Sequence, residues 1–332
     1  MQEILAIEGL HKHFTSSVSV TDRLFGKKPV VNRAVDGVNL VLRKGETLGL
    51  VGESGCGKST LARTIVGLHR PDAGTVRYAG TVLPARRRGA QHRAIQMVFQ
   101  DPYSSLNPRM TVGQTLGELL RYHKLVPRNK VADRCRELMS LVGLPDSALA
   151  QRPRQFSGGQ RQRIGIARAL AVEPTVLIAD EPVSALDVSV QATIINLLTE
   201  LKRTLDLSVI FVSHNMAVVR QVSDRTAVMY LGRIVETGVT DAVFDAPVHP
   251  YTQLLLKSVP RLGVPAAPSA ETDGVAIDVP AGANPCRFLD RCPAAVEGCA
   301  AEPGLLPDPA DPLRAAACVH VPWQASMSEE MA

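Results

Sequence analysis

The spacing of apolar residues predicts short strands near the start of the chain. Residues 4–8 are mostly apolar, and residues 35–42 alternate between apolar and polar positions over part of their length, as a half-buried strand does. Residues 44–46 form a predicted turn, and the apolar run at 47–51 is typical of a buried strand. Residues 16–33 are polar and basic, which predicts an exposed loop between the first two strands.

Helical spacing dominates further along the chain. Apolar residues recur three or four positions apart within residues 112–150, where Pro127 divides the region in two, and again within 160–171 and 190–205. Two apolar strands are predicted next to these helices, at residues 175–179 and 208–213. Strands that alternate with helices predict an α/β fold with a mainly parallel sheet and helices on its faces.

The composition narrows the class of protein. The chain has 332 residues, of which 45% are hydrophobic and 21% charged, and these globular values exclude wholesale disorder. The length suits one large domain plus an addition. No run of 18 apolar residues occurs, so we expect no membrane-spanning helix. Residues 1–4 show no basic start that leads into an apolar stretch, and we therefore expect a cytosolic chain.

The formal charge of +5 hides a division along the chain. Residues 261–332 hold four arginines, no lysine and ten acidic residues, so this tail carries −6 and the preceding 260 residues carry +11. The same tail contains ten of the 23 prolines and four of the six cysteines. Such a shift indicates a boundary. The basic body is compatible with nucleic acid, anionic lipid or nucleotide phosphate as a partner.

A glycine-rich loop follows the apolar run at 47–51 and matches the pattern G-x-x-x-x-G-K-[ST]. Glycines let the backbone turn its N–H groups towards phosphate oxygens, and the start of the next helix adds partial positive charge. Lys58 is predicted to reach the β- and γ-phosphates, and the Ser59 hydroxyl to bind Mg²⁺. This chemistry does not require Cys56, which we interpret as a packing residue. The loop comprises Gly52, Glu53, Ser54, Gly55, Cys56, Gly57, Lys58, Ser59 and Thr60.

Two adjacent carboxylates, Asp180 and Glu181, end the apolar strand at 175–179. Ligands of open α/β sheets bind at the carboxyl ends of the strands. Asp180 can hold Mg²⁺ directly or through water, and Glu181 can polarise an attacking water. The phosphate loop upstream favours these roles over an ordinary pair of solvated acids.

Further motifs make the chain resemble the ATP-binding subunits of ABC transporters. Residues 156–160, Phe-Ser-Gly-Gly-Gln, resemble the family signature, which usually begins with Leu. Residues 184–187, Ser-Ala-Leu-Asp, resemble the loop through which two ATPase subunits communicate. Gln100 comes between the phosphate loop and the signature, as in the family. His214 resembles the switch histidine, and Phe14 the aromatic residue that stacks on adenine.

The resemblance covers about residues 1–245 and implies an α/β P-loop NTPase (RecA-like) core. That core has a mainly parallel sheet, an antiparallel β part and an inserted helical subdomain at about 101–165. Two ATPase subunits would face each other head to tail, with each ATP between one phosphate loop and the other subunit's signature. The implied catalytic residues are Glu181, His214 and Gln100, and the implied Mg²⁺ ligands are Ser59, Gln100 and Asp180. The other implied ATP contacts are Phe14, Ser157, Gly158, Gly159, Gln160 and Asp187.

Two segments narrow the resemblance to dipeptide and oligopeptide importers: residues 101–109, Asp-Pro-Tyr-Ser-Ser-Leu-Asn-Pro-Arg, and residues 249–255, His-Pro-Tyr-Thr-Gln-Leu-Leu. This subfamily implies an ATPase that energises peptide import from the cytoplasmic face of the inner membrane. Its partners would be a second, related ATPase subunit, two membrane permeases and an extracytoplasmic binding protein.

Three alternatives stay open. Import of another small solute such as nickel is the first, because the subfamily contains such importers. An exporter ATPase is another, and the importer-like motifs and the cysteine tail argue against it. The runner-up class is a soluble ABC ATPase that acts on nucleic acid or ribosomes, although such chains usually carry two ATPase halves or a long coiled-coil insertion. We therefore expect no nucleic-acid partner.

The tail contains four cysteines in the spacing C-x5-C-x6-C-x18-C. Disulfides are rare in the cytosol, and a short proline-rich segment needs a staple, which favours a metal or a cluster. The spacing lacks the C-x-x-C pairs common in zinc sites. Residues 246–332 resemble the C-terminal extension of peptide-importer ATPases, some of which carry a four-iron, four-sulfur (4Fe-4S) cluster, although Pro285 replaces the usual glycine. The alternatives are a 4Fe-4S cluster first, zinc second and free thiols third, on Cys286, Cys292, Cys299 and Cys318.

Overall fold

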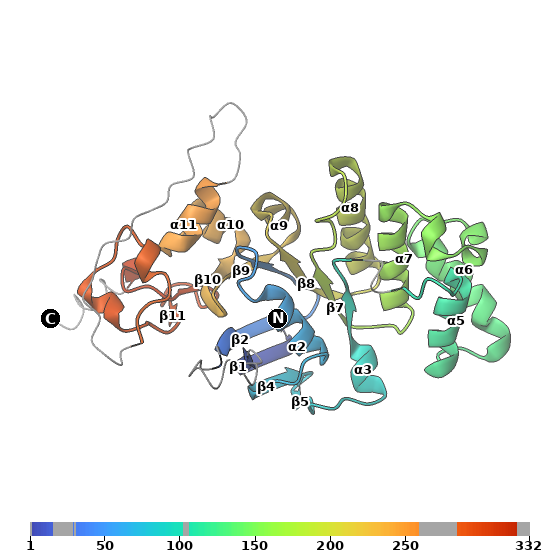
Figure 1. Cartoon of the computed structure of the whole chain (residues 1–332), viewed down its shortest axis with the longest axis horizontal. Coiled ribbons are helices and arrows are strands. Elements are labelled where there is room, and N and C mark those ends of the chain that lie inside the picture. The colour runs from blue at the N-terminus through green and yellow to red at the C-terminus, as the bar shows by residue number, and fades with distance from the viewer. Residues whose placement is uncertain (1, 16–28, 30, 102–105, 259–283, 324–332) are drawn as a thin grey trace, which may run out of the picture.

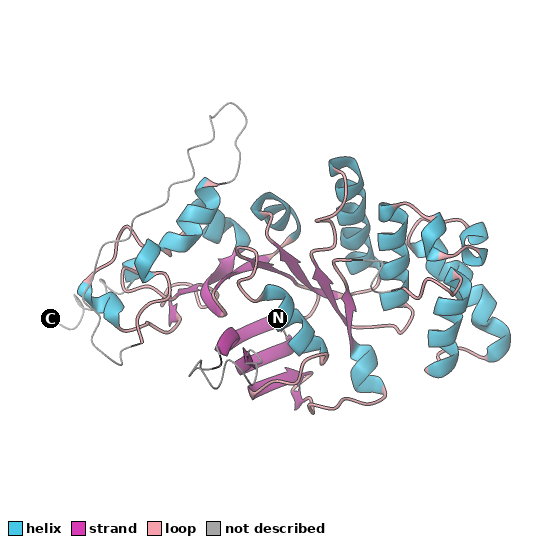
Figure 2. Cartoon of the chain, viewed as in Figure 1, coloured by secondary structure: helices cyan, strands magenta, loops and turns pink. Residues whose placement is uncertain are grey.

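The computed structural model describes residues 2–15, 29, 31–101, 106–258 and 284–323. Its centre is an eight-stranded sheet in the order β11-β12-β10-β9-β3-β8-β7-β6 (Figures 1 and 2). The strands from β9 to β6 run parallel to one another, which confirms the predicted mainly parallel α/β sheet. They are β9 (Arg225–Tyr230), β3 (Thr47–Val51), β8 (Ser208–Ser213), β7 (Val176–Asp180) and β6 (Ile95–Val98).

Each face of this central sheet has its own hydrophobic core. On one face, Leu50 and Ile178 pack with α2 (Lys58–Val66) and with a second sheet. On the other face, Leu177 packs with helices. The helices of that face include α8 (Val188–Thr204) and α9 (Met216–Val222). Strands β3, β7 and β8 are buried at every position, and this explains why their sequences are almost continuously apolar.

The second sheet is antiparallel, as the family resemblance implies. Its order is β2 (Val31–Arg43), β1 (Glu3–Thr15), β4 (Ala73–Tyr78) and β5 (Thr81–Val82). Strand β1 extends beyond the predicted residues 4–8 because register shifts near Leu10 and Phe14 break the alternation of apolar and polar positions.

The predicted loop at 16–33 is wrong at its end, since residues 31–33 belong to β2, where all three are exposed. Residues 16–28 and residue 30 lie outside the described residues.

A group of helices occupies one end of the molecule (Figure 1). The predicted helical region at 112–150 contains α5 (Val112–Tyr122) and α6 (Val131–Leu141), followed by the 3₁₀ turns η2 (Asp146–Ala150) and η3 (Pro153–Gln155). The next helix is α7 (Gly158–Leu170), and a 3₁₀ turn, η1 (Arg128–Lys130), leads into α6. The smaller helices elsewhere are α3 (Ala90–Ala94), α10 (Thr240–Asp245) and α11 (Pro250–Lys257).

The C-terminal segment lies at the opposite end of the molecule and continues the central sheet (Figure 1). Strand β10 (Arg233–Val239) pairs with β12 (Ala315–Ala316), which pairs with β11 (Leu306–Pro307). Of the four tail cysteines, Cys292 directly follows the 3₁₀ turn η4 (Leu289–Arg291) and Cys299 lies within η5 (Glu297–Ala300). Within the described residues, no helix combines the length and the apolar character needed to cross a bilayer.

Candidate functional site

The predicted phosphate loop connects the central strand β3 to α2. Gly57 caps α2 with a φ of 111°, in the region that favours glycine. A Cβ at this position would lie 1.9 Å from the carbonyl oxygen of Ala34. In the described chain no side chain caps α2, so its first amides are available to an anion.

Lys58 is buried inside this loop. Its Nζ donates hydrogen bonds to the carbonyl oxygens of Gly52, at 2.8 Å, and Glu53, at 2.9 Å. The ammonium group is therefore held among the backbone groups that would surround a phosphate. Cys56 is buried in the core under α2, which confirms its interpretation as a packing residue, and Ser54 and Gly55 are exposed.

Ser59 and Asp180 form the second part of the site. Ser59 Oγ donates to Asp180 Oδ1 at 2.9 Å. Asp180 is fully buried, and its Oδ2 has no hydrogen-bond partner within the part of the chain that the structure describes. Burial raises the pKa of the Asp180 carboxyl, and the hydrogen bond from Ser59 opposes that rise. A hydroxyl and a buried carboxylate with a free oxygen fit Mg²⁺, which binds oxygen ligands.

Three predicted catalytic residues meet where neighbouring parallel strands end. Gln100 follows β6, Glu181 follows β7 and His214 follows β8. Glu181 Oε2 accepts a hydrogen bond from Gln100 Nε2 at 3.1 Å and lies 3.3 Å from His214 Nδ1.

Glu181 itself has an unusual backbone conformation. Its φ is 44°, which costs a non-glycine residue about 1–3 kcal/mol, and its N–H donates to the carbonyl oxygen of Val212 at 2.9 Å. This conformation places the Glu181 carboxylate between the Gln100 and His214 side chains.

The signature residues start α7. Ser157 Oγ accepts from the Gln160 N–H at 3.3 Å, and Gln160 Oε1 accepts from the Ser157 N–H at 3.0 Å. A Cβ on Gly159 would lie 2.4 Å from Val190 Cγ1, so glycine is needed where α7 packs on α8. A Cβ on Gly158 would lie 3.2 Å from the Leu186 side chain. Helix α7 belongs to the core on the face of the central sheet opposite α2, so the signature and the phosphate loop belong to different faces of the sheet.

Two further predicted contacts lie on exposed positions. Asp187 is the N-cap residue of α8 and is exposed. Phe14 lies near the end of β1 with 39% of its surface exposed, and its ring meets the His69 ring edge to face, at 5.5 Å between centroids. Both side chains are accessible to a ligand or a second subunit.

Two residues outside the predicted set contact the phosphate loop. The Tyr251 hydroxyl accepts a hydrogen bond from the Glu53 N–H at 2.8 Å. Arg291 donates to both carboxylate oxygens of Glu53, at 2.9 and 3.0 Å. Tyr251 lies in the importer-like segment 249–255 and Arg291 lies between Cys286 and Cys292, but neither motif indicates a contact with Glu53.

The four tail cysteines line one small cavity together with His249 and His320. All six cysteines of the chain are free thiols. Burial raises the pKa of Cys286 to about 11 and also raises the pKa of Cys292 and of Cys318, and the neighbouring thiols add to each rise. Four thiols that face one cavity and influence one another's ionisation fit a group that binds thiolates.

Comparisons with known proteins match both halves of the chain. Residues 35–184 match the family model described as ABC transporter, and residues 235–299 match the one described as oligopeptide/dipeptide transporter, C-terminal region. The oligopeptide transport ATP-binding protein OppF of Salmonella typhimurium is 46% identical over 304 residues, which cover 90% of each chain. The oligopeptide transport ATP-binding protein AppF of Bacillus subtilis is 44% identical over 305 residues, which cover 90% of this chain and 92% of the relative.

Solved structures share the fold of about three quarters of the chain. The cbiO1 protein from Clostridium perfringens, part of the ABC transporter complex cbiONQ, has a TM-score of 0.62 and 27% identity, over 74% of this chain and 92% of the other. The ATP-binding cassette MJ0796, in a dimeric post-hydrolysis state with ADP and phosphate, has a TM-score of 0.61 and 26% identity, over 71% of this chain and 99% of the other.

Proposed function

The chain belongs to the ATP-binding proteins of ABC transporters, in the group of oligopeptide importers, and on this basis we propose that it hydrolyses ATP to energise peptide import through partner permeases. The observation that carries the ATPase assignment is the meeting of Glu181 with Gln100 and His214, beside the pair of Ser59 and Asp180. The relatives are named oligopeptide transport ATP-binding proteins, and this favours a peptide over nickel or nucleic acid as the substrate.

Each residue of the site has a separate role in ATP binding or hydrolysis in this proposal. Lys58 and the first amides of α2 bind the β- and γ-phosphates, and Phe14 stacks on the adenine. Glu181 orients and polarises the attacking water. His214 and Gln100 hold the Glu181 carboxylate in place and contact the γ-phosphate. Mg²⁺ held by Ser59, Asp180 and Gln100 would supply charge neutralisation at the phosphates.

A second ATPase subunit completes each ATP site in this proposal. Ser157, Gly158, Gly159 and Gln160 of one subunit present a helix N-terminus to the γ-phosphate held by the other, and Asp187 lies at their interface. Support comes from the exposure of Asp187 and from the dimeric state of the related cassette. The second subunit is a related, non-identical chain in our proposal.

Substitution of Glu181 by Gln tests the assignment. The amide keeps the size of the side chain but cannot polarise water, so ATP binding is retained and turnover is abolished. Lys58→Ala is the matched control because it removes binding itself. Hydrolysis by Glu181→Gln at the parental rate would show that the catalytic role is wrong.

The permease contact is proposed for a groove between the ATPase core and the helical part. Leu68, 60% exposed, and Tyr122, 78% exposed, lie on it beside Phe99, which directly precedes Gln100, and beside the basic Arg93. A permease segment docked here would sense the state of Gln100. The chain then lies on the cytoplasmic face of the inner membrane as a peripheral subunit, and an extracytoplasmic binding protein delivers the peptide.

Tyr122→Ala tests this groove. We expect it to reduce co-purification with the permeases and transport in liposomes, while ATP binding by the free subunit is unchanged. Val296→Ser, an exposed apolar residue at the other end of the molecule, is the control. Full permease binding by Tyr122→Ala would exclude the groove.

The four tail cysteines are proposed to hold a 4Fe-4S cluster, with zinc as the alternative. Support comes from the convergence of four thiols on one cavity, since thiolates are the ligands of such clusters. Iron and zinc analysis with visible absorbance after anaerobic purification separates the two, and a preparation without either metal would exclude both. In this proposal residues 1–245 are the ATPase domain, with its helical subdomain at about 101–165, and residues 246–332 are the importer-type extension.

A further inference from the structure

We propose that Arg291 is a positioning residue for ATP, which acts through Glu53 to hold the first turn of the phosphate loop. The C-terminal segment is then part of the nucleotide site. The proposal rests on the proposed ATPase function. It assigns a role to two contacts that connect residues far apart in the sequence.

The contact between Arg291 and Glu53 has the geometry of a strong ion pair. Both terminal nitrogens of the guanidinium group donate to the two carboxylate oxygens, at 2.9 and 3.0 Å. The guanidinium also lies over the rings of Phe288 and Tyr230, at 5.6 and 5.8 Å from their centroids. Two aromatic faces and a bidentate pair restrict Arg291 to one orientation.

A second contact holds the backbone of the same loop residue. The Glu53 N–H donates to the hydroxyl of Tyr251, a fully buried residue of α11, at 2.8 Å. The Tyr251 ring packs on Tyr230 and Phe288, with centroids 4.4 and 5.5 Å apart. Glu53 is therefore held at its side chain by Arg291 and at its amide by Tyr251, and both of these residues pack in the same aromatic cluster.

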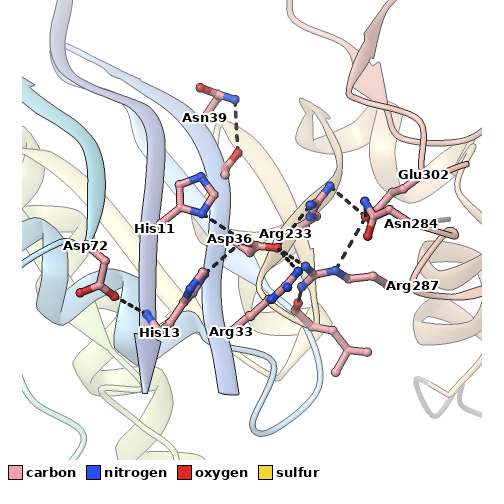
Figure 3. Close-up of polar contacts among 12 residues, drawn as sticks. His11, His13, Arg33, Asp36, Asn39, Asp72, Arg233, Asn284, Arg287 and Glu302 are labelled. Carbon is pink, nitrogen blue, oxygen red and sulfur yellow. Dashed lines mark hydrogen bonds and ion pairs between the residues drawn. The ribbon is translucent and has the colours of Figure 1, made fainter. Parts of the chain in front are cut away.

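The same tail segment is also tied to the antiparallel sheet (Figure 3). Arg287 bonds to Asp36 of β2, a buried residue that also accepts from Arg233 Nη2 at 3.2 Å. His11 and His13 of β1 lie 2.9 and 3.1 Å from the same carboxylate. Arginines already neutralise this carboxylate, which makes the cluster a poor cation site despite its two histidines.

Arg287 lies just before η4 and Arg291 is its last residue, so both arginines lie between Cys286 and Cys292. Arg287 binds the sheet whose strand β1 carries Phe14, and Arg291 binds the phosphate loop. The short segment between these cysteines therefore contacts both elements that are proposed to hold the nucleotide.

The phosphate loop needs such external contacts because its own backbone is permissive. Gly52, Gly55 and Gly57 all have positive φ, at 154°, 82° and 111°. Glycine loses much conformational freedom when it becomes ordered, so a loop held in place before ATP arrives loses less entropy on binding. Loss of the Arg291 contact should therefore weaken ATP binding, while the chemistry at Glu181 is unaffected.

The experiment measures ATP binding with a fluorescent ATP analogue and steady-state ATPase activity on the full chain. Arg291→Ala and Glu53→Gln should each raise Kd and KM about two- to fivefold, the range for a partly exposed bidentate pair, with kcat unchanged. The double variant should be no weaker than either single variant. Arg291→Lys keeps the charge but cannot form the bidentate contact, so its Kd and KM should lie between those of the parent and those of Arg291→Ala.

Arg314→Ala is the matched control. Arg314 belongs to the same tail, lies over the Trp323 ring at 5.6 Å and bonds to the Ala246 carbonyl, so its loss perturbs tail packing without touching Glu53. We expect it to leave KM unchanged. An equal rise in KM for Arg314→Ala, additive losses in the double variant, or an unchanged KM for Arg291→Ala would each overturn the proposal. If the parent chain and Lys58→Ala bind ATP equally, the ATPase function itself is wrong.

Discussion

Asp180 is expected to destabilise the protein when no Mg²⁺ is bound. Its carboxylate is fully buried, Ser59 is its hydrogen-bond donor, and Oδ2 has no partner in the described chain. Asp180→Asn removes the charge and keeps the shape, so Oδ1 can still accept from Ser59. The variant should therefore fold more stably than the parent while it loses ATP hydrolysis that depends on Mg²⁺.

The size of the effect follows from the unsatisfied oxygen. A buried polar group without a partner costs about 1–3 kcal/mol, and more when it is charged. The amide nitrogen of Asn also lacks a partner at this position. Asp180→Asn therefore raises the free energy of unfolding by the difference in cost between an unpaired charged oxygen and an unpaired neutral amide, about 1–2 kcal/mol. For a chain of 332 residues each 1 kcal/mol shifts Tm by about 1–2 °C.

The pH dependence provides an independent check. Burial raises the pKa of Asp180 above its usual 3.8, and the Ser59 hydrogen bond only partly opposes this. The folded state therefore holds the proton at pH values where the unfolded chain has released it. The destabilisation is absent at low pH and develops as pH rises from 3.8 through the folded pKa. The stability difference between Asp180→Asn and the parent should grow over this window and then stay constant.

The assay is urea and thermal unfolding of the nucleotide-free chain in a chelator, at several pH values from about 4 to 8. Asp146→Asn, which removes an exposed carboxylate of η2, is the control and should change neither Tm nor its pH dependence. A second titration with Mg·ATP should stabilise the parent and not Asp180→Asn. Equal or lower stability of Asp180→Asn across the whole pH range would refute the reasoning.

Three other substitutions test the geometry of the site. Gly57→Ala should abolish ATP binding with the circular dichroism spectrum unchanged, because its Cβ would lie 1.9 Å from a backbone oxygen of Ala34. Gly159→Ala should cost about 1–3 kcal/mol in urea unfolding, since its Cβ would lie 2.4 Å from Val190 Cγ1, and adding Val190→Ala should restore part of the loss. Asp36→Asn should lower the unfolding free energy by about 3–5 kcal/mol at neutral pH. Burial opposes ionisation of Asp36, but Arg287 and the hydrogen bonds from His13 and Arg233 hold its pKa well below 3.8, so this stability is lost on acidification and Asp36→Asn should be less sensitive to acid than the parent.

Strands β3, β7 and β8 were predictable because every position is buried and apolar side chains fill both faces. Strands β9 and β10 were not predicted, because each carries a buried charge that breaks the apolar pattern. Arg225 of β9 pairs with Glu46 at 3.1 Å, and Glu236 of β10 is fully buried and accepts from the N–H groups of Val248 and His249. The sequence alone does not distinguish a buried charged residue that is paired by tertiary contacts from a charged residue exposed to solvent.

The same difference applies within the site. Gln100, Glu181 and His214 could be expected to meet because each follows a strand of one parallel sheet, and such strands present their ends at one edge. The contacts of Glu53 with Tyr251 and Arg291 join residues 198 and 238 positions apart. No local pattern specifies them, since they depend on how the C-terminal segment packs beside β9.

The acidic residues of the tail lie partly on its outer surface, although the largely buried Glu302 side chain pairs with Arg233 at 2.8 Å. Of its four arginines, Arg287 and Arg291 bind Asp36 and Glu53 of the basic body, whereas the acidic Asp290 and Glu297 are exposed. Phe288 is buried in the core with Tyr230 and Tyr251, and β12 extends the central sheet. Removal of this segment would leave Glu53 without Arg291 and Asp36 with Arg233 but without Arg287, and it would expose an aromatic cluster beside the phosphate loop. The segment that resembles peptide importers therefore helps to stabilise the ATPase core, and substitutions within it should change the affinity for ATP.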